Sequence, residues 1–375
     1  NMDIDEGGNL MLTSNSDLRI EYEGRLTNNG TISGAGYITF VGNDSVMGQL
    51  KNNATLTNSG IVRVEKDMLA SSGWYFMNFP FDVPETNITD ANTGEQLTWG
   101  GIKDNDYDFY AGQYNGRGRD MWGYANVLGE GVYWENVPSN EFVKNKGYII
   151  ATETDRRIRF SAGNIAQDMF NKETLALEAF KGTTNNWSVH HSWNLMGNPY
   201  AVGFNLKNAT QDHSPFYFYN GNTYETIMRN DELIINPFTS FFFQAFGSDN
   251  AITFNNAGIG FKAANIEGEF DEIGLTINSK NYSDLFRLRI QDIATNSFDK
   301  GLDGLKLTSP NTLVPQLYNT YNGTPYSVNA IPMPTSNSTT IPLTVYIPTK
   351  GNYTIKFTSP EKIKRFEKVY LTDVT

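Results

Sequence analysis

Short runs of alternating apolar and polar residues make up most of this 375-residue chain, and Asn-Gly and Gly-x-Gly turns separate them. Alternation with a period of two is typical of half-buried strands, and Asn-Gly supplies the positive φ angles that tight hairpin turns require. Only residues 165–180 place apolar side chains at three- and four-residue steps, which predicts a helix there. The pattern therefore predicts an all-β protein with one connecting helix.

Residues 1–70 contain short strands, few large side chains and a recurring turn. The segment 26–30 (LTNNG) returns thirty positions later as 56–60 (LTNSG). Repeated short strands joined by Asn- and Gly-rich turns predict the coils of a β-solenoid. Because a solenoid needs at least about three repeats for stability, we expect this one to continue upstream or to be capped by the residues that follow.

A duplication follows the solenoid-like segment. Residues 74–80 (WYFMNFP) match 193–199 (WNLMGNP), with Trp, Met and Pro at identical positions. Each copy then reaches a Tyr-Asn-Gly turn and ends on a pair of apolar strands, in which the spacing aligns Tyr148 with Phe242. This pattern predicts two copies of one β-module, of which the first carries a longer insertion.

Residues 265–375 again alternate apolar and polar positions between turn signals, which predicts a C-terminal β-sandwich. The expected domains are a solenoid-like end (1–70), a first β-module (71–163), a connecting helix with the second β-module (164–260) and the sandwich (265–375).

Composition and charge limit the classes of partner that we expect the chain to bind. The 39% of hydrophobic residues suffices for packed cores, whereas the net charge of -12 repels nucleic-acid phosphates. The chain contains no apolar run of about 18 residues, so we expect no membrane insertion by this segment. The absence of cysteine excludes thiol chemistry and cysteine-ligated metals. The chain opens on Asn1-Met2-Asp3 without a basic, apolar leader, so we expect a mature exported fragment.

Catalytic signatures are absent from the sequence, which contains no Gly-x-Ser-x-Gly elbow, Walker loop or His-Glu-x-x-His motif. Adjacent His190 and His191 would point to opposite faces of a strand, which is poor geometry for shared metal ligation. Two facing carboxylates could hydrolyse glycosides, but 41 acidic residues single out no pair. We expect a protein that is not an enzyme, with a glycoside hydrolase as the alternative.

Calcium is the one cofactor that the sequence suggests. Asp299 and Asp303 lie four positions apart around glycines, in the segment DKGLDG, and carboxylates are the ligands that calcium prefers. The segment does not match the twelve-residue calcium loop. The other interpretation is a turn in which both side chains accept hydrogen bonds from nearby amides.

Aromatic residues of the first repeat's insertion form the candidate ligand site. Exposed rings beside planar polar groups can stack on sugar rings or anchor a protein partner, and loops often carry function. The other interpretation is an ordinary sandwich core. The candidate ligand-binding residues are Trp122, Tyr124, Tyr133, Trp134, Arg117 and Arg119.

Three segments carry a family resemblance: SWNLMGNPYAVGFNL, FYFYNGNTYE and INPFTSFFFQAF. They resemble secreted, adhesin-like surface proteins of Bacteroidetes-type bacteria, and the resemblance covers roughly residues 70–375. It implies an extracellular or cell-surface location, with a segment like 286–332 often preceding a sorting or anchoring domain. We therefore expect an adhesin-like protein that recognises a glycan or an extracellular host protein. The further alternative is a structural stalk that presents another domain.

Overall fold

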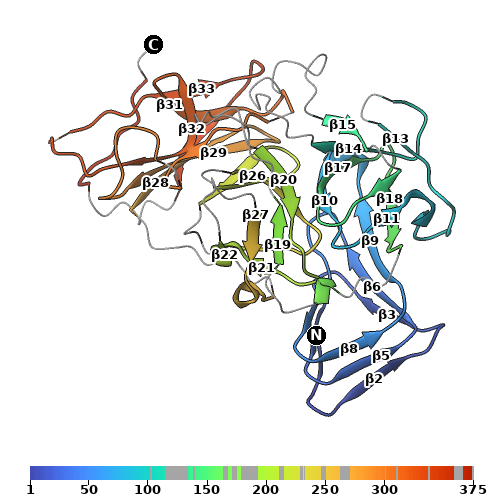
Figure 1. Cartoon of the computed structure of the whole chain (residues 1–375). Helices are drawn as coiled ribbons and strands as arrows, with labels where there is room; N and C mark the ends of the chain where they lie inside the picture. The colour runs from blue at the N-terminus through green and yellow to red at the C-terminus, as the bar shows by residue number, and fades with distance from the viewer. Residues whose placement is uncertain are drawn as a thin grey trace. The chain divides into compact units, whose positions relative to one another are not determined.

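The computed structural model describes most of the chain: residues 1–101, 104–114, 134–137, 140–163, 168–170, 175–178, 193–210, 215–228, 231, 233–245, 251–261, 271–299, 301–309, 311–336, 338–358 and 366–373. These residues form strands and short 3-10 helices, so the all-β prediction is confirmed (Figure 1). None of the helices in these ranges is both long and apolar enough to cross a membrane. The strands belong to two compact units, of which the first holds β1–β22 and β25–β27 and the second holds β23, β24 and β28–β34.

The first unit begins with a three-faced solenoid of parallel strands (Figure 1). One face stacks β1 (Met2–Ile4), β4 (Arg25–Asn28) and β7 (Gln49–Asn52). The second stacks β2 (Asn9–Leu12), β5 (Thr31–Gly34) and β8 (Thr55–Asn58). The third stacks β3 (Asp17–Ile20), β6 (Tyr37–Gly42) and β9 (Val62–Met68). The predicted solenoid is therefore confirmed, with three rungs among the described residues.

The rung period differs from the spacing of the recurring turn. Leu26 pairs with Leu50 and Ile38 with Val62, so adjacent positions on these rungs lie 24 residues apart. The thirty-residue recurrence instead relates β4 to β8, which lie on different faces. Both strands end on a buried asparagine, Asn28 and Asn58, that donates to backbone carbonyl groups at a corner. The recurrence therefore marks a shared corner structure and not the rung.

The second module caps the last rung of the solenoid. Leu50 donates its backbone N–H to the carbonyl of Ala201 at 2.9 Å, and Gly203 donates to Oε1 of Gln49 at 3.0 Å. These bonds occupy the edge of β7 that would otherwise remain open. The expectation that following residues cap the solenoid is confirmed at this face.

The two modules repeat one strand plan. In the first, β10 (Tyr75–Asn78), β17 (Gly147–Ala151), β14 (Phe109–Tyr114) and β13 (Trp99–Gly100) form a sheet. Beside it lie the pairs β11 (Val83–Pro84) with β16 (Glu141–Phe142) and β12 (Ile88–Asp90) with β18 (Arg156–Ser161). The second module reproduces these pairs with β20 (Trp193–Gly197) and β26 (Ser240–Gln244), β21 (Phe204–Asn205) and β25 (Ile234–Ile235), and β22 (Ala209–Thr210) and β27 (Ala251–Phe254). The predicted duplication is confirmed.

The predicted helix over residues 165–180 is wrong wherever the structure describes that segment. Asp168–Phe170 form one 3-10 turn, η4, and Leu175–Glu178 form strand β19. β19 pairs antiparallel with β27, as β9 pairs with β18 in the first module. Pairing with a distant strand has outweighed the local helical preference of Leu, Ala and Glu.

Reciprocal contacts join the modules into one body. By strand pairing, Met77 of the first module corresponds to Met196 of the second, and Lys146 corresponds to Thr239. The backbone bridges between the modules are reciprocal, because Met77 pairs with Thr239 and Met196 pairs with Lys146. An approximate two-fold axis therefore relates the copies. The same register equates Tyr148 with Phe241, so the sequence alignment of Tyr148 with Phe242 is one residue off.

Asn78 and Gly197 occupy equivalent positions and face each other across this axis. A Cβ atom on Gly197 would lie 2.0 Å from Cγ of Asn78, whose buried amide donates to the carbonyl of Asn198 at 3.0 Å. Two side chains do not fit here. We expect Gly197→Ala to lower the unfolding free energy by about 1–3 kcal/mol through overpacking.

Urea titration checks this prediction in two backgrounds. Because Asn78→Gly removes the atoms that would clash, Gly197→Ala should cost less in the Asn78→Gly variant than in the native chain. An equal cost in both backgrounds would contradict the proposed clash.

The second unit is a seven-stranded sheet with the β23 (Phe216–Tyr219) and β24 (Tyr224–Ile227) hairpin. Its strands run in the order β33 (Leu343–Tyr346), β31 (Gln316–Tyr321), β32 (Thr324–Ile331), β29 (Ser283–Ile290), β28 (Glu272–Asn278) and β34 (Thr354–Thr358). A short strand, β30 (Gly304–Leu305), also pairs with β32. Ile273, Leu275, Phe286, Leu288 and Leu317 form its core. The predicted β-sandwich-like C-terminal region is therefore present.

Candidate functional site

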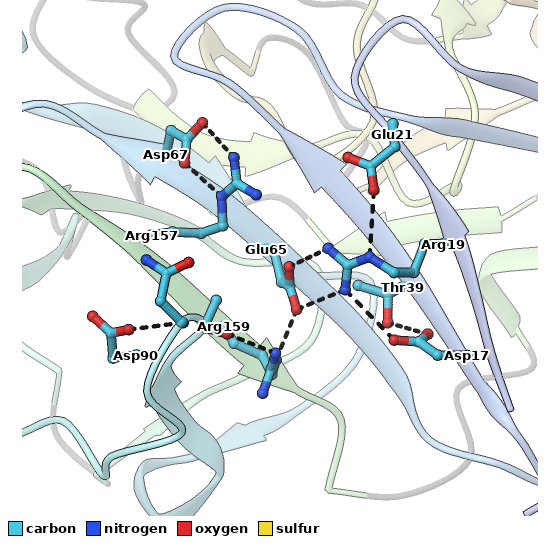
Figure 2. A network of polar contacts seen from close by, with 11 residues as sticks. Asp17, Arg19, Glu21, Thr39, Glu65, Asp67, Asp90, Arg157 and Arg159 are labelled. Carbon is cyan, nitrogen blue, oxygen red and sulfur yellow. Dashed lines mark hydrogen bonds and ion pairs between the residues drawn. The ribbon is translucent and has the colours of Figure 1, made fainter. Parts of the chain in front are cut away.

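A row of charged side chains crosses the outer face of the sheet formed by β12, β18, β9, β6 and β3 (Figure 2). Glu65 of β9 lies at its centre with its side chain 2% exposed. Its carboxylate accepts hydrogen bonds from Arg19 of β3 at 2.7 Å and from Arg159 of β18 at 2.8 Å. Three strands that are distant in sequence are thus joined through one carboxylate.

The electrostatics of Glu65 favour its charged form. Burial alone would raise the pKa of this carboxyl group, but the hydrogen bonds from Arg19 and Arg159 hold the pKa below its usual value. The same pairing raises the pKa of Arg19. A carboxylate held in this way is a poor proton donor near neutral pH, so Glu65 is suited to a structural role and not to general acid catalysis.

The rest of the row is paired in the same manner (Figure 2). Asp17 lies 3.5 Å from Arg19 and accepts a hydrogen bond from Thr39, and Asp67 accepts two from Arg157 at 2.6 and 2.8 Å. Sequence reasoning did not single out these residues. The sequence feature that could have indicated this row is the occurrence of charged residues at alternate positions of a strand, as at Glu65 and Asp67.

Among the carboxyl groups that the structure describes, Asp303 is the one whose pKa is raised. Burial raises its pKa to about 7, and its residue is 1% exposed. Its oxygens accept backbone N–H groups of Asp299 and Ala330, both at 2.7 Å. A carboxyl group so enclosed has no path to a glycosidic oxygen, although its pKa would suit a general acid.

The proposed calcium ligands Asp299 and Asp303 lie in one turn. Asp299 accepts hydrogen bonds from the backbone N–H of Thr295 at 2.5 Å and from its hydroxyl at 3.0 Å, and Asp303 accepts the N–H of Asp299. This arrangement matches the turn interpretation of the segment. In the described ranges, no three His, Asp or Glu side chains gather in a way that could hold a metal ion.

The raised pKa of Asp303 predicts a pH dependence of stability. Because the folded state binds this proton more tightly than the unfolded state does, stability should fall as pH rises from about 4 to about 7 and then level off. Replacing Asp303 with Asn removes this contribution. The difference in urea midpoint between wild type and Asp303→Asn should therefore depend on pH in that window, and a difference independent of pH would contradict the assignment.

Trp134 belongs to a four-ring cluster that joins the two modules. It lies on β15 (Trp134–Asn136), opposite Tyr114 of β14, and its ring centroid is 5.8 Å from that of Tyr114. The rings of Phe76 on β10 and Phe242 on β26 lie 6.0 and 5.9 Å away. Trp134 and Tyr114 are half-buried, whereas Phe76 and Phe242 are buried.

The cluster includes the two residues that flank the insertion segment, which we define as residues 115–133. Tyr114 pairs with Trp134 across the β14–β15 ladder, so the residues on either side of this segment lie opposite each other. The other candidate ligand residues, Arg117, Arg119, Trp122, Tyr124 and Tyr133, lie outside the described residues.

The cluster includes residues that sequence reasoning missed. Phe76 and Phe242 come from different modules and form an edge-on contact with a centroid distance of 5.8 Å. The only sequence feature that pointed to these two residues was the run of aromatic residues around each of them. Tyr107 is 42% exposed, but it precedes β14 and therefore lies toward the end of that strand opposite to Tyr114.

Aromatic residues and arginine are residue types that can hold a sugar ring or an apolar anchor of a protein. Comparisons of this chain with protein families, with curated proteins and with solved structures give no match.

Proposed function

We propose that this chain is an adhesin-like, non-catalytic binding protein of the cell surface or extracellular space, recognising a glycan or an extracellular host protein. The observation that carries this proposal is the four-ring cluster of Phe76, Tyr114, Trp134 and Phe242, two of which flank the insertion segment in sequence. Packing between the modules fixes these rings before any ligand binds, so binding to them costs little further side-chain entropy.

The composition of the insertion segment supports the same proposal. Trp122 and Tyr124 follow Arg117 and Arg119 within a few residues of the sequence. Aromatic rings and guanidinium groups are enriched at binding hot spots, and both stack on flat ligand surfaces. The acidic net charge of -12 favours uncharged glycans or basic protein surfaces over anionic ligands.

A glycoside hydrolase is the alternative, and it requires two facing carboxyl groups, one of which carries a raised pKa. In the described part of the chain, the carboxyl group with a raised pKa is the enclosed Asp303. Glu65, by contrast, is held in its charged form by two guanidinium groups. These environments support binding over hydrolysis.

An array of glycans and extracellular-matrix proteins tests the proposal with the 375-residue chain. We expect the wild type to bind one ligand class and the Trp122→Ala, Tyr124→Ala variant to lose at least about tenfold in affinity, as a hot-spot truncation does. Tyr22→Ala is the matched control, because Tyr22 is a 50% exposed aromatic residue of the solenoid.

The outcomes separate the candidate functions. Equal loss in the control variant would indicate non-specific adhesion by exposed rings. Cleavage of a bound polysaccharide would favour the hydrolase. A wild-type chain that binds nothing would contradict the binding proposal and favour a structural stalk, for which the stacked solenoid rungs are suited.

A further inference from the structure

A buried lysine and a buried aspartate meet in the second unit. Asp284 lies on β29 and shares the interior face of that strand with Phe286 and Leu288. Lys306 directly follows β30. Their side chains are 2% exposed for Lys306 and 1% exposed for Asp284. An amine and a carboxyl group are thereby held together inside an apolar core.

The contact geometry brings the amine to the carboxyl carbon. Nζ of Lys306 lies 2.6 Å from Oδ1 and 2.5 Å from Oδ2 of Asp284. Because Nζ is hydrogen-bonded to both oxygens, it lies close to the plane of the carboxylate, about 3 Å from Cγ, which is the separation of a near-attack arrangement. Rotation of the carboxyl group about its Cβ–Cγ bond turns the face to which a nucleophile adds toward the amine.

Two hydrogen-bond donors polarise the carboxyl group of Asp284. The backbone N–H of Leu317 donates to Oδ2 at 2.7 Å, and the hydroxyl of Thr223 donates to Oδ1 at 3.1 Å. Fixed donors of this kind stabilise the negative oxygen that forms when a nucleophile adds to a carbonyl carbon. The site thus contains a nucleophile, an electrophile and an oxyanion-stabilising donor.

We propose that Lys306 and Asp284 condense to an intramolecular isopeptide bond. A proton first passes from the ammonium group of Lys306 to the carboxylate of Asp284 along the hydrogen bond that joins them. The free amine then attacks Cγ, a C–N bond forms and a C–O bond breaks. The departing oxygen leaves as water with two protons that began on Nζ, so atoms and charge balance without a further reactant.

The bond would lock the second unit independently of any ligand. It would join β29 to the segment after β30, two parts of the fold that are separated by 21 intervening residues. Exclusion of water from a site this buried protects the amide from hydrolysis. The inference does not depend on the proposed binding function, because all four residues that carry it belong to the second unit.

Intact-mass spectrometry of the folded full chain tests the proposal directly. We expect a mass lower than the sequence mass by one water molecule. Trypsin cannot cleave after an acylated lysine, so the digest should contain a branched peptide that joins residues 281–287 to residues 301–350. A folded chain at full sequence mass, which trypsin cleaves after Lys306 once it is denatured, would overturn the proposal.

Two controls keep the mass result specific. Lys306→Arg retains a cation for Asp284 but lacks the amine, so this variant should keep its full mass. Asp303-Gly304 could also lose water by closing on its own backbone, and fragment spectra distinguish this product because it joins no second peptide. Water loss in Lys306→Arg, or water loss confined to residues 303–304 of the wild type, would overturn the isopeptide assignment.

Discussion

Asp284→Ala should lower the free energy of unfolding by about 3–5 kcal/mol, because it leaves a buried cation without its partner. Lys306, at 2% exposure, has no access to water that could replace the two contacts of its ammonium group with Asp284. The backbone N–H of Leu317 also loses its acceptor. Any isopeptide bond in the wild type would enlarge the loss.

The double variant Asp284→Leu, Lys306→Met separates charge burial from loss of packing. Removing both charges together avoids the unpaired ammonium group, so this variant should be more stable than Asp284→Ala. Urea unfolding, monitored by hydrogen exchange of peptides from the second unit, measures both variants, because five of the six tryptophans lie in the first unit. A double variant that is less stable than Asp284→Ala would show that charge burial does not dominate the effect.

Glu65→Ala should lower the free energy of unfolding by about 3 kcal/mol, because it removes the nearly fully buried carboxylate that joins three strands by hydrogen bonds. Arg19 and Arg159 both lose their shared acceptor, although each is partly exposed and can recover some hydration. Glu21→Ala is the matched control. Glu21 lies 3.3 Å from Arg19 with its side chain 55% exposed, so its removal should lower the free energy of unfolding by less than about 1 kcal/mol.

The Glu65 effect should depend on pH in a defined direction. The folded-state pKa of Glu65 lies below the value in the unfolded chain. Its stabilising contribution is therefore complete above the unfolded pKa and is lost as pH falls through the folded pKa. The stability difference between wild type and Glu65→Ala should shrink in acid, and a difference that grows in acid would contradict the charge assignment.

Local patterns sufficed to predict strands and the duplication but not the partner of each strand. The match between residues 74–80 and 193–199 revealed the repeat because Trp and Met fill equivalent positions. The helix prediction for residues 165–180 failed because β19 acquires its strand conformation from β27, which lies more than 70 residues away.

The rung period was hidden for a related reason. Between the first two rungs, Asn9 pairs with Thr31 and Asp17 with Tyr37, so the spacing shortens to 22 and 20 residues before it settles at 24. A repeat search along the chain cannot detect so few irregular turns. It detected the corner asparagines instead, because Asn28 and Asn58 each donate a hydrogen bond to a backbone carbonyl group at a corner.

The candidate site was predictable only in part. Trp134 stood out as an aromatic residue in an unmatched insertion, whereas Phe76 and Phe242 meet it only through contacts between the modules. The Glu65 network was not predictable for a similar reason, since its three strands pair across long sequence separations.

The most direct test of the binding proposal replaces the insertion segment. Because Tyr114 and Trp134 are paired, a short Asn-Gly turn can join β14 to β15 in place of residues 115–133 while the four-ring cluster is kept. A binding isotherm should be measured for this variant and for the wild type with the best ligand from the array. The account predicts an unchanged melting temperature and complete loss of binding. Unchanged affinity in the folded variant would contradict it.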